Sequence, residues 1–101
     1  MFEIEHGDDG TIQLRGRFDA AQVETAGRVF REVTGSPLVD FRELTYISSA
    51  GLGLLFATHK RLVDAGGGLR LVNLNPHISE VFQIAGFHHI FSIEETSDGG
   101  G

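Results

Sequence analysis

Strand-like runs alternate with amphipathic segments along this sequence, and that alternation restricts the fold more than any other feature. Around the turn G-D-D-G at 7–10, apolar and polar residues alternate, which predicts a β-hairpin within residues 2–16. Three later segments have helical spacing, at about 20–33, 49–65 and 76–85. Strand-like runs lie at 37–41, 69–74 and 90–93. The order β-β-α-β-α-β-α-β predicts one α/β domain with a mixed, centrally parallel sheet, helices packed against it and the hairpin at its side.

The helix boundaries carry their own signals. Asp19 is placed to cap the first helix, because its carboxylate can accept hydrogen bonds from the free N–H groups of the first turn. Gly66 to Gly68 and Gly86 are predicted to end the second and third helices, and Pro76 suits the first turn of the third. Residues 42–47 are interpreted as a loop that leads into the second helix.

The second helix has an apolar face and a solvent face. At 100° per residue, its inward face is predicted to hold Leu52, Leu55, Phe56, His59, Leu62 and Val63. Its outward face is predicted to hold Leu54, Ala57, Thr58 and Arg61. An exposed leucine one turn from the helix start is a candidate partner contact.

Composition limits the class of protein. A chain of 101 residues is large enough for a single core, and we expect one domain over 1–95 with a flexible Gly-rich tail at 96–101. The net charge of -6 argues against a nucleic-acid partner, which normally requires clustered lysine and arginine. No apolar run reaches the roughly 18 residues of a membrane span, and M-F-E-I-E-H is no signal peptide. The chain is therefore expected to be cytoplasmic, away from membranes, and the absence of cysteine agrees with a reducing compartment.

The stretch Y-I-S-S-A-G-L-G at 46–53 is the candidate functional motif, because it lies where a strand-like run leads into a helix. Functional groups in open α/β sheets collect at such junctions. The two serines could be a helix cap, a nucleophile or a site of modification. Ser48, further out, is the better cap, while Ser49 falls in the first turn, where a helix N-terminus tolerates an attached phosphate. Gly51 and Gly53 would let a partner approach the hydroxyl.

Catalytic and cofactor motifs are not matched by the sequence. A nucleophile elbow centred on Ser49 needs glycine where Ile47 stands, and neither a Walker A nor a dinucleotide fingerprint is present. His59 is interpreted as a histidine of the core or its boundary. His88 and His89 have no acidic cluster with ligand spacing beside them, so no metal and no cofactor are predicted.

Three segments together resemble the STAS domain family, specifically the bacterial anti-sigma-factor antagonists. The signature-like segment is L-V-D-F-R-E-L-T-Y-I-S-S-A-G-L-G-L-L at 38–55. The segments L-R-G-R-F-D-A-A at 14–21 and G-G-G-L-R-L-V-N-L-N-P-H-I-S-E-V-F-Q-I-A-G-F at 66–87 resemble the family in the same order and spacing. The resemblance covers roughly residues 2–95.

The resemblance implies a protein-binding switch and no enzyme. Family members of this size bind an anti-sigma factor that is also a serine kinase, which releases a sigma factor. Phosphorylation of a serine at the start of the second helix breaks the complex, and a PP2C-type phosphatase restores it. By position the phosphoacceptor is Ser49, with Ser48 as the alternative. Ser48 stands at the family's usual acidic position, and Ala50 replaces a common hydroxyl residue.

A partner surface around the acceptor is implied by the same resemblance. Its predicted residues are Asp19, Ser48, Ala50, Gly51, Gly53, Leu54, Ala57 and Arg61. A different hypothesis keeps the fold and drops the switch: STAS-like domains also serve as subunits of phospholipid transport assemblies or other regulatory complexes, and as small-molecule binding modules. In that case the serines would be caps only.

Overall fold

A five-stranded sheet forms the centre of the molecule. The computed structural model describes residues 1–94 of the 101-residue chain. Its strands are β1 (Phe2–His6), β2 (Ile12–Phe18), β3 (Leu38–Ile47), β4 (Arg70–Val72) and β5 (Ser92–Glu94). Its helices are α1 (Val23–Phe30), α2 (Ser49–Asp64) and α3 (Pro76–Ile84), with 3-10 turns η1 (Ala20–Gln22) and η2 (Phe87–His89). The tail predicted at 96–101 lies outside the described residues.

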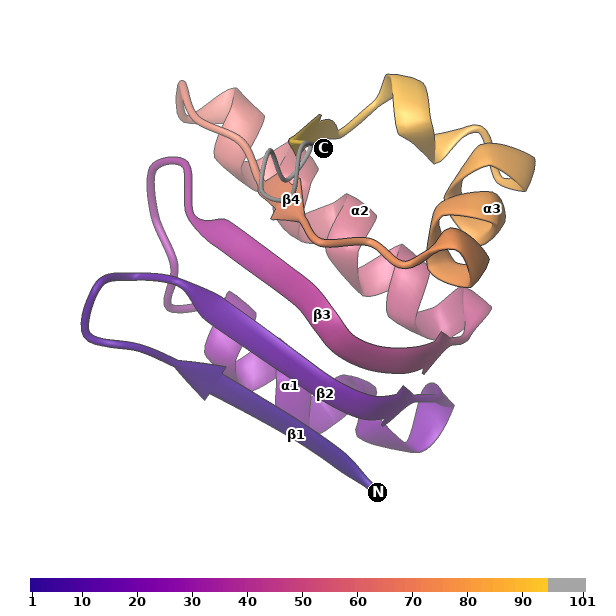
Figure 1. Ribbon diagram of the computed structural model, residues 1–101. Coiled ribbons are helices and arrows are strands. Elements are labelled where there is room, and N and C mark those ends of the chain that lie inside the picture. Colours follow the sequence, from indigo (N-terminus) through magenta and orange to yellow (C-terminus); the bar gives the residue numbers. More distant parts are fainter. Residues whose placement is uncertain (95–101) are drawn as a thin grey trace.

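The strands lie in the sheet in chain order, β1-β2-β3-β4-β5 (Figure 1). β1 pairs antiparallel with β2, and the three remaining pairs are parallel. The prediction of a mixed sheet with the hairpin at its side is therefore confirmed.

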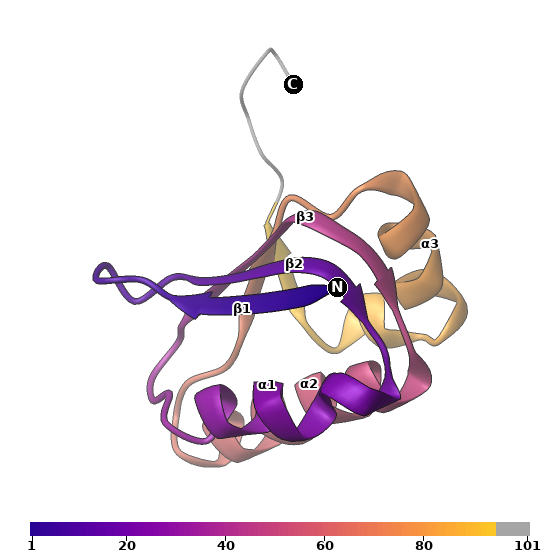
Figure 2. The same ribbon diagram turned by 90° about the horizontal axis from the view of Figure 1, so that it is seen from below.

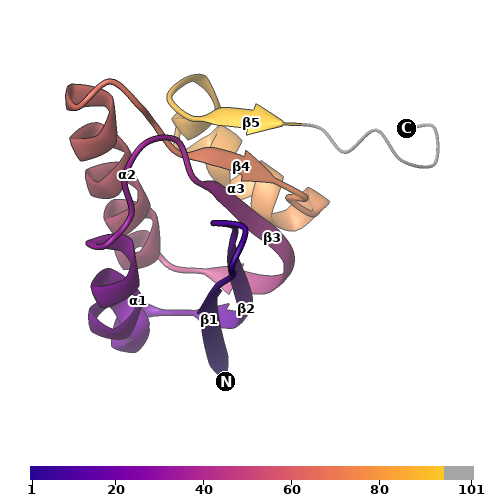
Figure 3. The same ribbon diagram turned by 90° about the vertical axis from the view of Figure 1, so that its left-hand side faces the viewer.

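The helices leave one face of the first three strands uncovered. Figures 2 and 3 show α1 and α2 side by side on one face of the sheet, with α3 to one side of them beyond β3. The core lies beneath the sheet on the side of α1 and α2. Its largest fully buried side chains include Phe18, Phe30, Phe41 and Phe82. On the opposite face, Arg15 bridges neighbouring strands through Glu3, Glu5 and Glu43.

β3 runs to Ile47, so the loop predicted at 42–47 is wrong. The register against β2 shifts twice, between Gln13 and Arg15 and between Gly16 and Arg17, and each shift places one extra residue in β3. The buried residues at this end are consequently three apart, at Phe41, Leu44 and Ile47. Because strand patterns are recognised by a period of two, a doubly bulged strand does not resemble one.

The other element boundaries differ from the predictions by a few residues. A 3-10 turn precedes α1, which begins at Val23 and ends at Phe30. β4 is confined to three residues, and the last strand begins at Ser92 because η2 occupies residues 87–89. α3 ends at Ile84, and Gly86, the predicted terminator, follows its C-cap with a positive φ of 77°.

A cap that the sequence analysis missed fixes the start of α3. The side-chain oxygen of Asn75 accepts a hydrogen bond from the N–H of Ile78 at 2.8 Å, as an N-cap should. The amide nitrogen of Asn75 donates to the carbonyl of Leu44 at 3.0 Å, beside the second bulge of β3. One side chain therefore both caps α3 and attaches it to β3.

Candidate functional site

The candidate site lies at the carboxyl ends of β2 and β3. Figure 1 shows the arrowheads of both strands pointing to one edge, where η1 and the start of α2 also lie. The N–H of Ser48 donates to the carbonyl of Phe18 at 2.9 Å and joins the two strand ends. The predicted residues Asp19, Ser48 and Ser49 are thus brought together at this edge.

Asp19 is an N-cap, but of the 3-10 turn η1 that precedes α1 and not, as was predicted, of α1 itself. Its carboxylate accepts a hydrogen bond from the N–H of Ala21 at 3.1 Å, at the start of η1. The side chain is half-buried. Its charge therefore serves the turn before α1 while remaining next to the start of α2.

Ser48 is the N-cap of α2. Its backbone is extended, with φ -88° and ψ 169°, and its hydroxyl oxygen accepts a hydrogen bond from the N–H of Gly51 at 3.1 Å. The carbonyl of Ser48 accepts the first intrahelical bond, from Leu52 at 2.9 Å. The prediction that Ser48 caps the helix is confirmed.

Ser49 occupies the first position of α2 and is exposed. Within the described residues, its hydroxyl makes no hydrogen bond to another group of the protein. The first-turn N–H groups of Gly51 and Leu52 are bonded to Ser48, whereas those of Ser49 and Ala50 remain open to an anion. The hydroxyl of Ser49 is accessible in a region that electrostatically favours negative charge.

The two glycines of the motif have different surroundings. A Cβ on Gly53 would meet nothing within 4 Å, so this position is flat and open beside Ala50. Gly51 is buried, and a Cβ there would lie 3.2 Å from the ring of Phe18 and 3.1 Å from Ile47. Gly51 therefore lies against the core, and we exclude it from the exposed surface that the sequence analysis placed it in.

Leu54 and Ala57 continue the surface along α2. Ala57 is exposed, whereas Leu54 is half-buried because it packs against the core and approaches Gly27 of α1. Arg61 is exposed, but its guanidinium donates to the carbonyls of Phe30 at 2.8 Å and Val33 at 3.1 Å. Arg61 thus has a structural contact at the end of α1 that its predicted place on a partner surface did not anticipate.

The inward face of α2 differs from the predicted one. Thr58, predicted in solvent, is 6% exposed, and its hydroxyl donates to the carbonyl of Leu54 at 2.8 Å. Phe56 and Val63, predicted inside, are 38% and 49% exposed. A threonine can enter the core because its hydroxyl is satisfied by its own helix, a possibility that hydropathy alone does not represent.

His59 has a structural role, in agreement with its interpretation as a boundary histidine. Its Nδ1 accepts a hydrogen bond from the N–H of Leu69 at 3.0 Å, and its ring lies 4.9 Å from that of Phe91. The imidazole therefore links the middle of α2 to the chain entering β4 and to the aromatic residues before β5.

Arg17 and Tyr46 form a contact at the same edge that was not predicted from the sequence. The guanidinium carbon of Arg17 lies 4.2 Å from the centre of the Tyr46 ring. The two residues are register partners at the ends of β2 and β3. Both residues stand in the sequence motifs at this edge, R-G-R-F-D and T-Y-I-S-S. Their pairing depends on two β-bulges in a segment that was predicted to be a loop.

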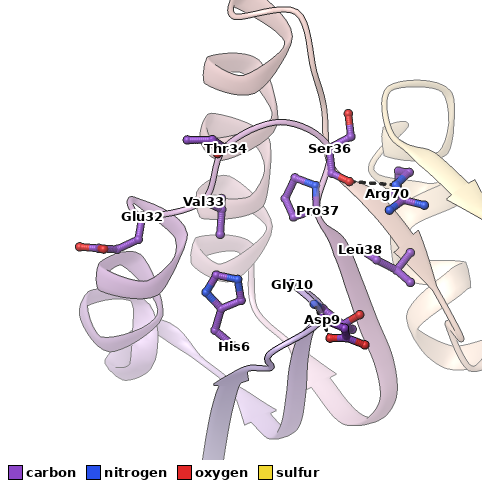
Figure 4. A pocket seen from close by; sticks show the side chains of 11 residues that line it. His6, Asp9, Gly10, Glu32, Val33, Thr34, Ser36, Pro37, Leu38 and Arg70 are labelled. Carbon is purple, nitrogen blue, oxygen red and sulfur yellow. Dashed lines mark hydrogen bonds between the residues drawn. The ribbon is translucent and has the colours of Figure 1, made fainter.

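A cavity of about 390 Å³ lies at the opposite end of the sheet, where β2, β3 and β4 begin. Figure 4 shows the His6 ring between Val33 and the hairpin turn at Gly10. In that turn the N–H of Thr11 donates to Asp9 at 2.9 Å and lowers the pKa of this carboxyl. The cavity is remote from Ser48 and Ser49, so it is no part of the candidate site.

Residues 1–94 contain no group of three or more His, Cys, Asp or Glu side chains suited to holding a metal ion. The rings of His88 and His89 have centres 3.8 Å apart and are tilted by 41° to each other, and they belong to no such group. None of the helices in that range has the length and apolar character required to cross a membrane.

Comparison with known proteins gives one consistent family. A model described as the STAS domain matches residues 3–99. A STAS-domain containing protein of Pseudomonas aeruginosa is 29% identical over 90 residues, which are 86% of this chain and 89% of that protein. The anti-sigma-B factor antagonist of Bacillus subtilis is 36% identical over 59 residues, 58% of this chain and 54% of the relative.

A solved structure shares the fold. The Bacillus cell fate determinant SpoIIAA in its phosphorylated form is similar with a TM-score of 0.69 and 22% identity, over 97% of this chain and 93% of that one. At this identity the likeness concerns the arrangement of strands and helices. Because the family model spans nearly the whole sequence and the fold agrees with it, the chain belongs to the STAS domain family.

Proposed function

We propose that this chain is an anti-sigma-factor antagonist that acts as a protein-binding switch, and that phosphorylation of Ser49 turns it off. The unphosphorylated form binds an anti-sigma factor that is also a serine kinase, and a PP2C-type phosphatase removes the phosphate. The site of action is in the cytoplasm, where the sigma factor works. The curated relative named anti-sigma-B factor antagonist supports this assignment of class.

The proposal depends on the different hydrogen bonding of the two serine hydroxyls. The hydroxyl of Ser48 is occupied by the N–H of Gly51, and removing such a cap costs about 1 kcal/mol. The hydroxyl of Ser49 is exposed and unbonded within the described residues. A kinase can therefore phosphorylate the Ser49 hydroxyl without breaking the N-cap hydrogen bond of Ser48. This favours Ser49 over Ser48 as the acceptor.

The surroundings of Ser49 suit a contact that a phosphate would break. Ala50, Gly53 and Ala57 are small and exposed, so a partner can lie close to the helix. Asp19 and Leu54 border this flat surface. A phosphate brings about -1.5 to -2 charges into it, and a buried charge without a partner typically costs roughly 2–5 kcal/mol in a protein interface. Phosphorylation would then weaken binding by about 30-fold to several thousand-fold.

Phosphorylation is tested by incubating the protein with its cognate kinase and ATP, followed by mass spectrometry of peptides covering residues 43–60. We expect one phosphate on the wild type and on Ser48→Ala, and none on Ser49→Ala. Far-UV circular dichroism checks that each variant is folded. Label that persists in Ser49→Ala and disappears in Ser48→Ala would show that the acceptor assignment is wrong.

Binding is tested by calorimetry of the same kinase with wild type, Ser49→Asp and Ser36→Asp. Ser36 is exposed and lies before β3, at the far end of the sheet from Ser49. The matched control therefore adds the same charge away from the surface. We expect a loss of at least tenfold in affinity for Ser49→Asp alone. Equal affinities for all three proteins would contradict the switch and favour a permanent subunit of another assembly.

A further inference from the structure

Arg17 differs from Arg15, Arg61 and Arg70 in what its guanidinium contacts. Arg15 is surrounded by three glutamates, Arg61 binds two backbone carbonyls, and Arg70 pairs with Glu94. Arg17 lies over the Tyr46 ring at 4.2 Å, and within the described residues no carboxylate pairs with it. Its hydrogen-bond donors therefore remain available for an anion.

Arg17 is also placed at the edge that holds Ser49. Arg17 and Tyr46 pair across β2 and β3, the next pair is Phe18 and Ile47, and Ser48 then bonds to the carbonyl of Phe18. Ser49 therefore lies only two Cα steps beyond Ile47, each about 3.8 Å. Phe18 is the last residue of β2, so Arg17 lies one residue from the strand end that bonds to Ser48.

Within residues 1–94, the segments that meet at this edge contain no lysine and no other arginine. The last two residues of β2 and β3 and the first turns of α1, α2 and α3 contain Arg17 as their one permanently charged cation. Asp19 is the neighbouring carboxylate, and it is engaged with the N–H of Ala21. A phosphate on Ser49 would thus meet one free guanidinium.

The strengths of the two contacts decide which one Arg17 would make. An exposed cation–π contact is a weak interaction. A hydrogen bond between two charged groups is stronger, and the arginine fork can make two such bonds to one phosphate. A phosphate within reach would therefore displace the Tyr46 ring as the partner of Arg17.

We infer that Arg17 is the intramolecular phosphate-binding residue of this switch: it rests on Tyr46 in the unphosphorylated protein and moves to the phosphate of Ser49 after modification. The inference rests on the proposed function, in that Ser49 is taken as the acceptor. Phosphorylation then does more than add charge to α2. It also removes a cation from the ends of β2 and β3 and uncovers the Tyr46 ring, so the surface that a partner meets changes on two elements.

The test uses the whole protein with phosphoserine introduced genetically at position 49, so that no kinase is needed. In the unphosphorylated protein, the ring current of Tyr46 should shift the side-chain CH₂ protons of Arg17 to high field in NMR spectra. We expect this shift to be lost in the phosphoserine protein. We also expect the ³¹P titration of the phosphate to have its midpoint at lower pH than in an Arg17→Ala background, because Arg17 favours the dianion.

Arg42→Ala is the matched control, since Arg42 is exposed on β3, five residues from the strand end, and its loss changes the net charge equally. It should titrate like the wild type. A midpoint unchanged by Arg17→Ala, or Arg17 protons that keep their high-field shift beside phosphoserine, would overturn the inference. Failure of a kinase to label Ser49 would instead contradict the proposed function, and this measurement would still give its answer.

Discussion

At the scale of single residues, neighbouring positions of one motif have opposite surroundings. Ser48 faces the backbone of α2 and Ser49 faces solvent, although both are serines. Gly51 lies against Phe18 and Ile47, whereas Gly53 faces open space. Both differences arise in the first turn of α2, because successive residues of a helix point in different directions.

The serines should differ in their contribution to stability. Ser48→Ala removes the hydroxyl that accepts from Gly51 and should lower the free energy of unfolding by about 1 kcal/mol. Ser49→Ala removes no hydrogen bond of the described structure and should stay within about 0.5 kcal/mol of the wild type. Urea unfolding followed by far-UV circular dichroism measures both. A larger loss for Ser49→Ala would mean that the cap is misassigned.

The glycines should respond to alanine with opposite signs. Gly53→Ala gains helix propensity without meeting an atom, and should raise the free energy of unfolding by about 0.5–1 kcal/mol. Gly51→Ala gains the same propensity but presses on Phe18 and Ile47, which are 0% and 4% exposed and have little room to move. Overpacking typically costs about 1–3 kcal/mol, so the net effect should be destabilising. Parallel urea titrations decide, and stabilisation by both substitutions would refute the packing argument.

At the scale of elements, α1 and α2 are joined by the side chain of Arg61, which was predicted from the sequence to contact a partner protein. Arg61 of α2 donates to the carbonyls of Phe30 and Val33, at and just beyond the end of α1. A helix C-terminus leaves such carbonyls without intrahelical partners, and a cation there also complements the helix dipole. The contact therefore fixes where α1 stops against its neighbour.

Arg61→Ala should loosen the end of α1. Loss of two charge-assisted hydrogen bonds at a partly exposed site should cost roughly 1–2 kcal/mol, and amide hydrogen exchange should accelerate from Phe30 to Val33. Lys60→Ala, at the adjacent exposed position, makes a suitable control and should change stability by less than about 0.5 kcal/mol. Unchanged hydrogen exchange in Arg61→Ala would show that the hydrogen bonds of Arg61 do not measurably stabilise the end of α1.

The elements also show what could be predicted from the sequence. The hairpin, the three helices, the parallel sheet and the Ser48 cap follow from local patterns of turns, caps and apolar spacing. The full length of β3 does not, because its two bulges convert a period of two into buried residues three apart. Two contacts were missed for a related reason: that of Arg17 with Tyr46, and the hydrogen bonds of Arg61 to the end of α1. Both join segments that meet only after folding.

At the scale of the whole molecule, the proposed switch lies on one edge of a sheet whose core is elsewhere. Ser49 is not among the buried core residues or the buried residues of α2. The N-terminus of α2 has N–H groups and a dipole that favour an anion. The fold should therefore accept the phosphate, and its effect should be confined to the surface.

Phosphoserine at position 49 should leave the folded state intact. We expect the far-UV circular dichroism spectrum to be unchanged and the free energy of unfolding to stay equal or rise by about 0.3–1 kcal/mol, because the negative charge complements the start of α2. Thermal unfolding of the two forms in low salt measures this. A large drop in stability would mean that the switch works by unfolding α2 and not by changing its surface.

Tyr46 adds an optical consequence to its contact with Arg17. The chain has one tyrosine and no tryptophan, so its tyrosine fluorescence arises from a single ring at the carboxyl end of β3. That ring lies three residues before Ser49, outside the fully buried core. Emission from this protein consequently reports the state of the edge where the serines lie, while the unfolding of the core is followed by its backbone signal.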